Sequence, residues 1–254
     1  MRLLLVLEAV SDFNYDLMYY SRVQAFIYSL LKFTEYDYLH DKKGFKFFSF
    51  SNIYPINEDM SISNGEEKFL LVSSPDKELM KSLSNQLRRL MRGDGLVTFG
   101  AMRFKLKSIK IFDISIPDTT FSIYTATPVI VRIQRKYYPI FNIKSDKPYI
   151  FWRREYGLRS FITMTKLNLL KKYQEFYGYD PPTLDIYQGI RLRRDHIPIK
   201  LYIGNKVVEQ VGSMWRFKYF YVDRDLKKTL KFLLDVGIGE RNSMGFGFLN
   251  LKED

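Results

Sequence analysis

The sequence predicts an α+β protein built from two tandem domains, and three observations support this class. Strand and helix patterns alternate along the first half, and the same order returns less regularly in the second half. Proline, serine and threonine interrupt both patterns at 114–127. At 254 residues the chain is long enough for two domains, which we expect at 1–118 and 119–254. The order β-α-β-β-α-β in each predicts two tandem ferredoxin-like (RRM-like) domains.

The first half is expected to hold two helices among short strands. Within 16–32, apolar side chains recur at helical spacing: Val23, Ile27, Leu30 and Leu31. A second helix begins near Ser74, which can cap it, and Pro75, which fits a first turn where no donor is needed; Gly93 ends it. The strands of this half are expected at 2–9, 44–50, 68–72, 96–99 and 101–112.

The second half repeats the order with one long and one short helix. The long helix is expected within 151–177, and the short helix is capped by Asp223 and ended by Gly237. An inward-facing stripe supports the short helix: Leu226, Leu230, Leu233 and Leu234. The strands are expected at 129–133, 184–193, 197–203, 214–222 and 246–251.

Composition excludes several kinds of site. The chain has no cysteine, which removes disulfides, thiol nucleophiles and cysteine-bound metals. With only two histidines, His40 and His196, we expect neither a metal centre nor a cofactor. Glu8 interrupts the apolar start, and no apolar run reaches the roughly 18 residues of a spanning helix. We therefore expect no export and no membrane partner, and a cytoplasmic setting.

The positive charge is concentrated in the second half. The net charge is +12, and residues 121–254 hold 24 Lys and Arg against 13 Asp and Glu. This asymmetry, with 17% aromatic residues, favours a polyanionic partner such as a nucleic acid. The candidate phosphate contacts are Arg132, Arg135, Lys136, Arg153, Arg154, Arg191, Arg193 and Arg194. A generic basic surface that keeps the protein soluble is the alternative interpretation.

A glycine-rich segment at 237–247 is the most distinctive motif. It matches neither the Rossmann nor the Walker spacing, and it precedes a strand instead of leading into a helix. Glycine lets a backbone approach another chain closely, so this loop is a candidate for phosphate contact, with a helix end and a tight turn as the structural alternative. The candidate residues are Gly237, Gly239, Arg241, Gly245 and Gly247.

Three further residues suggest acid–base chemistry. Tyr28 lies beside the apolar stripe of its helix, where it can face a cleft. His40 falls in a polar stretch between helix and strand, and Lys46 follows at the start of an aromatic segment. Taken singly, each is more often a packing or solvated residue than a catalytic one.

Together these segments resemble a known family. The helix at 19–28, the segment at 38–46 and the glycine-rich loop are similar to the CRISPR-associated endoribonucleases that process repeat RNA, the sixth CRISPR-associated family within the RAMP superfamily. The resemblance spans the chain and implies tandem ferredoxin-like domains, CRISPR precursor RNA as substrate, and Tyr28, His40 and Lys46 as catalytic residues. It leaves a homodimer and contact with CRISPR effector-complex subunits open.

Metal-free RNA cleavage needs the groups that these three residues supply. The 2′-hydroxyl attacks the adjacent phosphorus and the 5′-oxygen leaves, which requires a base, an acid and a cation. The resemblance implies Tyr28 at the 2′-hydroxyl, His40 at the leaving oxygen and Lys46 at the phosphate, although the first two roles can be exchanged. The expected products carry a 2′,3′-cyclic phosphate (or 3′-phosphate) and a 5′-hydroxyl. The alternatives are a non-catalytic RAMP-type RNA-binding subunit and an unrelated basic interaction domain.

Overall fold

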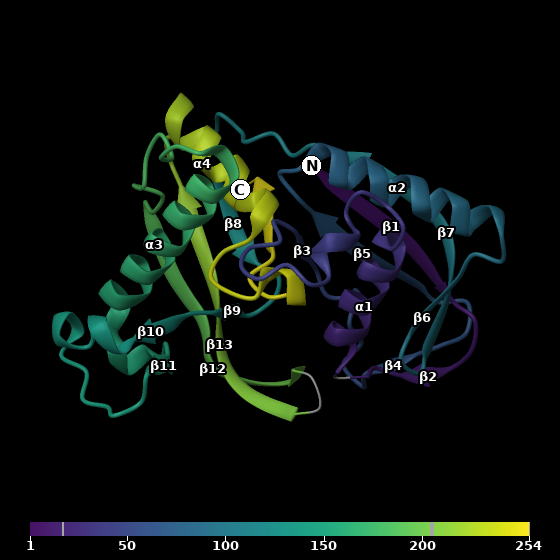
Figure 1. Ribbon diagram of the computed structural model, residues 1–254, viewed down its shortest axis with the longest axis horizontal. Helices are drawn as coiled ribbons and strands as arrows, with labels where there is room; N and C mark the ends of the chain where they lie inside the picture. The colour runs from purple at the N-terminus through teal and green to yellow at the C-terminus, as the bar shows by residue number, and fades with distance from the viewer. Residues whose placement is uncertain (17, 204–205, 254) are drawn as a thin grey trace. The chain divides into compact units, whose positions relative to one another are not determined.

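The chain forms two compact units in a computed structural model, which describes residues 1–16, 18–203 and 206–253 (Figure 1). Unit 1 comprises Met1–Ile114 together with Ser243–Gly245, and unit 2 comprises Ser115–Asn242 together with Phe246–Asp254. Three residues of the glycine-rich loop therefore belong to the N-terminal unit.

Unit 1 is built on an antiparallel sheet of the order β3-β5-β1-β7-β6. Its strands are β1 (Arg2–Ala9), β3 (Ser49–Phe50), β5 (Glu67–Ser73), β6 (Leu96–Phe99) and β7 (Met102–Phe112). The central β1 buries Leu3, Leu5 and Leu7, as its alternating pattern requires. Apart from the edge strand β6, this order is that of the predicted β-α-β-β-α-β fold. A separate pair joins β2 (Phe13–Asn14) to β4 (Ser61–Ile62).

The helices α1 (Tyr19–Leu31) and α2 (Lys77–Arg92) bury their apolar stripes in the same core. The buried side chains of α1 are Tyr19, Val23, Ile27 and Leu31. The cap of α2 is Asp76, whose carboxylate accepts hydrogen bonds from the backbone of Glu78 and Leu79, both at 3.0 Å. The predicted cap, Ser74, instead accepts from the backbone of Asp76.

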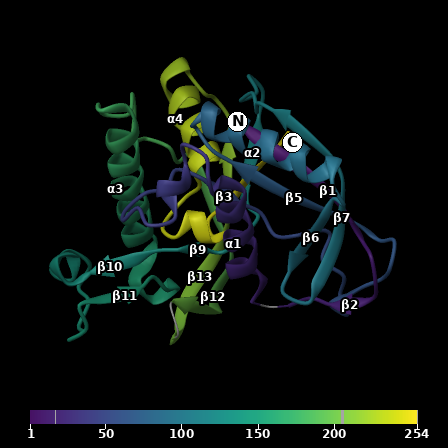
Figure 2. The same ribbon diagram turned by 45° about the vertical axis from the view of Figure 1, so that its right-hand side comes forward.

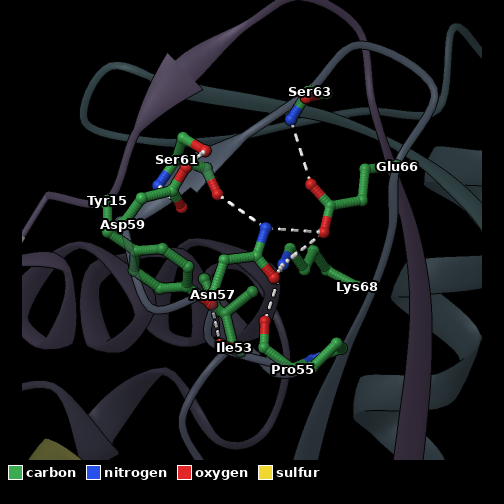
Figure 3. A network of polar contacts seen from close by, with 9 residues as sticks. All are labelled: Tyr15, Ile53, Pro55, Asn57, Asp59, Ser61, Ser63, Glu66 and Lys68. Carbon is green, nitrogen blue, oxygen red and sulfur yellow. Dashed lines mark hydrogen bonds and ion pairs between the residues drawn. The ribbon is translucent and has the colours of Figure 1, made fainter.

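A buried lysine ties the 51–66 segment of unit 1 to the sheet (Figure 3). The side chain of Lys68 on β5 is fully buried; its ammonium donates to the carbonyl of Pro55 at 2.6 Å and pairs with Glu66 at 2.7 Å. The amide of Asn57 donates to the same carboxylate at 3.0 Å. These contacts satisfy a buried charge with fixed oxygen acceptors.

Unit 2 has the same topology, with a sheet of the order β12-β13-β8-β14. Its strands are β8 (Phe121–Thr125), β12 (Gly189–Ile203), β13 (Lys206–Tyr219) and β14 (Leu249–Glu253), and β9 (Val129–Ile130) pairs with β13. The helix α3 (Gly157–Tyr177) lies along the sheet (Figure 2), and its Phe161 stacks on Trp215 at 3.9 Å. The helix α4 (Arg224–Val236) buries the predicted leucine stripe.

The predicted fold class is confirmed, and the predictions failed at particular elements. The stretch expected to separate the halves contains β8, a strand between β13 and β14. The expected strand at 44–50 shrinks to β3, because Phe47 adopts a positive φ of 52° that interrupts extended backbone. The expected helix at 151–177 begins at Gly157, since β11 (Tyr149–Phe151) pairs with β10 (Arg132–Gln134). The strands expected at 184–193 and 197–203 form one strand, β12, with irregular register at its middle.

Candidate active site

Tyr28 lies on α1 beside the buried stripe and is half-buried. Its ring meets that of His40 edge to face, with 5.4 Å between centroids. The ammonium of Lys46 lies over the Tyr28 ring, 4.7 Å from its centroid. Phenol, imidazole and ammonium thus come together in unit 1, although 18 residues of sequence separate the first from the last.

A short 3-10 turn holds His40 at the surface. The turn η1 (Asp37–Leu39) is anchored by the buried Leu39, while the side chain of His40 is 66% exposed. The Nδ1 atom of His40 lies 2.7 Å from a carboxylate oxygen of Asp41, so Nε2 is the ring nitrogen left for a substrate. Lys46 donates to the backbone carbonyl of His40 at 3.0 Å, which fixes its ammonium beside the imidazole.

An open hollow of about 660 Å³ lies in front of Tyr28 and His40. One wall is the outer face of α1 and the other is η1 with the residues that follow it. The lining residues are Ser21, Gln24, Ala25, Tyr28, Ser29, Lys32, Asp37, Tyr38, His40 and Asp41. A volume in this range suits a nucleotide-sized ligand, since small-molecule sites span about 300–1,000 Å³.

Two residues hold the hydroxyl group of Tyr28. The amide nitrogen of Gln24, one helical turn earlier, lies 3.4 Å from the Tyr28 oxygen and donates to the backbone carbonyl of Ser243 at 2.9 Å. The side chain of Ser243 also hydrogen-bonds Tyr28. Neither residue was among the candidates that the sequence patterns indicated. For Gln24, the i, i+4 spacing from Tyr28 is a signal that was available.

Burial sets the protonation of the site. It raises the pKa of Tyr28 to about 12, although the hydrogen bonds from Ser243 and Gln24 act in the opposite direction. Tyr28 is therefore a neutral phenol near pH 7. Burial lowers the pKa of Lys46, and the carboxylate of Asp41 opposes that shift.

The glycine-rich loop is packed inside the protein. All four of its glycines are buried: Gly237, Gly239, Gly245 and Gly247. A Cβ atom on Gly245 would stand 2.4 Å from Phe50, and one on Gly247 would stand 1.8 Å from the carbonyl of Ile238. The N–H groups of Gly237 and Gly247 already donate to the carbonyls of Leu233 and Pro128. The burial of these glycines shows a steric requirement for close packing, and the phosphate contacts expected at them stay a prediction.

Lys172, which the sequence analysis did not select, organises the loop within unit 2. This α3 residue is 2% exposed, and its ammonium donates to the carbonyls of Gly237 and Gly239 and to the side-chain oxygen of Asn242 at 2.9, 2.7 and 2.6 Å. Burial lowers its pKa to about 7, and Glu240 acts against that shift. Asn242 in turn donates to the carbonyls of Ile238 and Phe246.

The predicted basic residues of unit 2 fall into two groups. Six are exposed: Arg135, Lys136, Arg153, Arg154, Arg191 and Arg194. Arg193 is also exposed and lies over the ring of Tyr124, at 5.7 Å. Arg132 is ion-paired with Glu240 and lies over Tyr149, so its charge serves contacts inside the unit. Arg241 is half-buried, and burial lowers its pKa.

One face of the unit 2 sheet carries a row of polar and basic side chains. Arg191 lies opposite Arg216, Arg216 opposite Tyr124, and Tyr124 opposite Asn250. Arg216 also lies over the Tyr124 ring at 5.2 Å. The alternate residues of β13 are buried in the core: Trp215, Phe217 and Tyr219. The alternation in 214–219 is the sequence signal that would have identified Arg216.

The part of the chain that the structure describes contains neither a cluster of metal-ligating side chains nor a membrane-spanning helix. No group of three or more acidic or histidine side chains within 1–16, 18–203 and 206–253 is arranged to hold a metal ion. In the same part of the chain, no helix is both long and apolar enough to cross a membrane.

Known proteins resemble this chain over its whole length. Residues 110–251 match the family model described as CRISPR associated protein Cas6, C-terminal. The CRISPR-associated endoribonuclease Cas6 2 of Methanocaldococcus jannaschii is 32% identical over 257 residues, covering 98% of this chain and 99% of the relative. The CRISPR-associated endoribonuclease Cas6 of Haloferax mediterranei is 30% identical over 263 residues, covering 100% and 94%.

Solved structures share the fold. A CRISPR associated protein Cas6 superposes with a TM-score of 0.72 at 23% identity, covering 100% of this chain and 99% of the other. A RAMP protein that binds different RNA substrates superposes with a TM-score of 0.68 at 18% identity, covering both chains fully.

Two units of ferredoxin-like topology define the fold class of this chain, and solved Cas6 and RAMP structures share that fold. The full-length similarity narrows that class. The chain belongs to the Cas6 family of CRISPR-associated endoribonucleases.

Proposed function

We propose that this protein is a metal-independent endoribonuclease that cuts CRISPR precursor RNA within its repeat. One observation carries the proposal: Tyr28 and His40 line an open hollow with 5.4 Å between their ring centroids, and the ammonium of Lys46 lies 4.7 Å from the centroid of the Tyr28 ring. They supply a hydroxyl that can position the 2′-hydroxyl, an acid for the leaving 5′-oxygen and a cation for the phosphate. Relatives named as Cas6 endoribonucleases support the same reaction.

In the proposed reaction, a bond forms between the 2′-oxygen and phosphorus while the bond from phosphorus to the 5′-oxygen breaks. Nε2 of His40, protonated, gives its proton to the leaving 5′-oxygen, and Asp41 orients the ring through Nδ1. The ammonium of Lys46 faces the negative charge that grows on the phosphate oxygens. The products carry a 2′,3′-cyclic phosphate and a 5′-hydroxyl.

Tyr28 positions the attacking hydroxyl instead of deprotonating it. Its raised pKa makes it a poor base near pH 7, and Gln24 and Ser243 already donate to its oxygen. Its own O–H can then hydrogen-bond the 2′-oxygen. The 2′ proton passes to solvent water, which has access to the site because the side chain of His40 is 66% exposed. Gln24 and Ser243 are positioning residues in this proposal, because they act through Tyr28.

The RNA backbone is proposed to run over the basic face of unit 2. Arg193 and Arg216 lie over the half-buried ring of Tyr124, and Arg191 lies opposite Arg216 on the next strand. Arginines beside an aromatic ring offer both phosphate contacts and a stacking surface for unpaired bases. The exposed residues Arg153 and Arg154 add further positive charge to unit 2.

Incubation of the purified protein with repeat RNA in excess chelator tests the proposal. We expect one cut, its loss in His40→Ala, and its loss when the 2′-hydroxyl at the cut site is replaced by hydrogen. Cutting of the 2′-deoxy substrate would refute internal attack, and unchanged cutting by His40→Ala would remove His40 from the mechanism. Binding without cleavage by the wild-type protein would favour the alternative, a non-catalytic RAMP-type RNA-binding subunit.

We also retain as proposals a homodimer and contact with subunits of a CRISPR effector complex. The mass of the purified chain in solution, with and without repeat RNA, tests the homodimer. Co-purification with candidate effector subunits tests the second.

A further inference from the structure

An exposed aromatic ring lines the hollow beside His40. Tyr38 is 58% exposed and lies on η1, two residues before His40. Its neighbours hold the turn from both sides: Leu39 is buried, and the buried Tyr36 hydrogen-bonds Asp76 at 3.3 Å. The Tyr38 ring therefore extends into solvent from a fixed turn, although exposing so large an apolar surface is unfavourable.

The opposite wall of the hollow offers hydrogen-bond acceptors beside the ammonium of Lys32. The hydroxyl of Ser21 donates to the carbonyl of Met18 at 3.0 Å, and that of Ser29 donates to the carbonyl of Phe26 at 2.7 Å. Each hydroxyl has then used its proton, so only its oxygen lone pairs are left for a ligand. The carboxylate of Asp37 adds further acceptors at the lining.

The charges of the lining favour a neutral group over a phosphate inside the hollow. Lys32 and His40 are the basic residues there, and Asp37 and Asp41 are the acidic ones. A phosphate would meet two carboxylates, whereas a base with an exocyclic amino group would meet acceptors that suit its N–H donors. The scissile phosphate belongs at the edge, where Lys46 lies next to His40.

We propose that this hollow is a nucleobase subsite: it takes the unpaired base of a nucleotide that adjoins the scissile phosphate, stacked on Tyr38. The subsite prefers adenine, cytosine or guanine over uracil, because the lining offers acceptors to an exocyclic amino group. This inference rests on the proposed function, since His40 and Lys46 fix where the phosphate lies. Stacking of one base on an aromatic side chain corresponds to about 5- to 150-fold in affinity.

Fluorescence of a base analogue tests the stacking without any cleavage. Repeat RNA with a 2′-deoxy residue at the cut site carries 2-aminopurine, which has an exocyclic amino group, on one side of the scissile phosphate or the other. We expect quenching by the wild-type protein at one of the two positions. Tyr38→Phe should keep that quenching and Tyr38→Ala should lose it. Phe33→Ala is the matched control, because Phe33 is 89% exposed but lies outside the hollow lining.

A double-mutant cycle, in which Tyr38→Ala is combined with a change in the RNA, tests the same subsite through single-turnover cleavage rates. Tyr38→Ala should slow cleavage of the natural repeat about 5- to 150-fold. An abasic residue at the quenched position should slow the wild-type enzyme by a similar factor and should slow Tyr38→Ala no further. Uridine at that position should be cut more slowly than adenosine or cytidine.

The outcomes separate this inference from the proposed function. If Tyr38→Ala cleaves the repeat as fast as the wild-type protein, the subsite is refuted and the nuclease assignment stands. The same holds if the rate losses caused by Tyr38→Ala and by the abasic residue multiply when the two changes are combined. If adenosine and uridine are cut at the same rate, the preference for an amino group is refuted. If the wild-type protein neither binds nor cleaves repeat RNA, the proposed function fails together with the subsite.

Discussion

Replacement of Lys172 by methionine tests the account of the glycine-rich loop. The change keeps a side chain of similar length but leaves three oxygens without the ammonium: the carbonyls of Gly237 and Gly239 and the side-chain oxygen of Asn242. Removing one partner from a buried charged network typically costs about 3–5 kcal/mol. Because methionine no longer requires burial of a charge, we expect a loss near the lower end, about 3 kcal/mol.

Tryptophan fluorescence is a suitable probe of this loss. The chain has two tryptophans, Trp152 and Trp215, and both are buried in unit 2 with ring centroids 5.1 Å apart. Urea unfolding followed at this signal reports on the unit that contains Lys172. The expected loss corresponds to a fall in Tm of roughly 6–12 °C, at about 2–4 °C per kcal/mol.

The neighbouring Lys171→Met provides the matched control, because Lys171 is exposed on the same helix. It should unfold within about 0.5 kcal/mol of the wild-type protein. Equal stabilities of the Lys172→Met and wild-type proteins would contradict the role assigned to the buried ammonium.

Three other changes have defined outcomes. Gln24→Leu removes a donor to Tyr28, and single-turnover cleavage should slow about 2- to 13-fold with unchanged RNA affinity, since one hydrogen bond contributes about 0.5–1.5 kcal/mol. Glu66→Gln should lower the free energy of unfolding by about 1–3 kcal/mol at pH 7. The hydrogen bond from Lys68 lowers the pKa of Glu66, so the ion pair stabilises the fold at pH values above the pKa of Glu66 in the unfolded chain. The difference in stability between wild-type and Glu66→Gln proteins should disappear as the pH falls through the pKa of Glu66 in the folded protein. Arg216→Gln should weaken RNA binding and reduce the slope of log affinity against log salt by about 0.7, as expected for one lost phosphate contact on a single strand.

Each of these changes has a control or a contradicting result. Wild-type cleavage by Gln24→Leu would exclude the positioning of Tyr28 through its amide. A stability difference for Glu66→Gln that persists at pH 2 would show that packing and not charge is responsible. Lys200→Gln is the control for Arg216, because Lys200 lies on the neighbouring strand opposite Glu209, and it should leave the salt slope unchanged. An unchanged slope in Arg216→Gln would remove it from the RNA path.

Local periodicity predicted the helices of this fold well, and long-range pairing decided where it failed. The apolar spacing of Val23 and Ile27 predicted α1 and left Tyr28 beside the buried stripe, as observed. The strand β8 was missed because serines and threonines surround it; its place between β13 and β14 depends on partners about 90 to 130 residues away.

The site was only partly predictable from single residues. His40 and Tyr28 were selected with the help of the family resemblance, but nothing local shows that η1 folds back toward α1. Lys172 follows another lysine in a helix and has the pattern of a solvated residue, because its three acceptors lie more than 60 residues away. The sequence could not separate a phosphate-binding role of the glycines from close packing, since glycine serves both equally well.

The central claim is that Tyr28, His40 and Lys46 act on one scissile linkage, with His40 as the acid. A repeat RNA with sulfur in place of the bridging 5′-oxygen tests this most directly, because a thiolate leaves without needing a proton. We predict that this substrate restores cleavage by His40→Ala to within about tenfold of the wild-type rate, given the 10²–10⁴-fold typical of acid catalysis, and does not restore cleavage by Lys46→Ala. If the sulfur-substituted RNA restores cleavage by neither His40→Ala nor Lys46→Ala, the assignment of His40 to the leaving oxygen is contradicted.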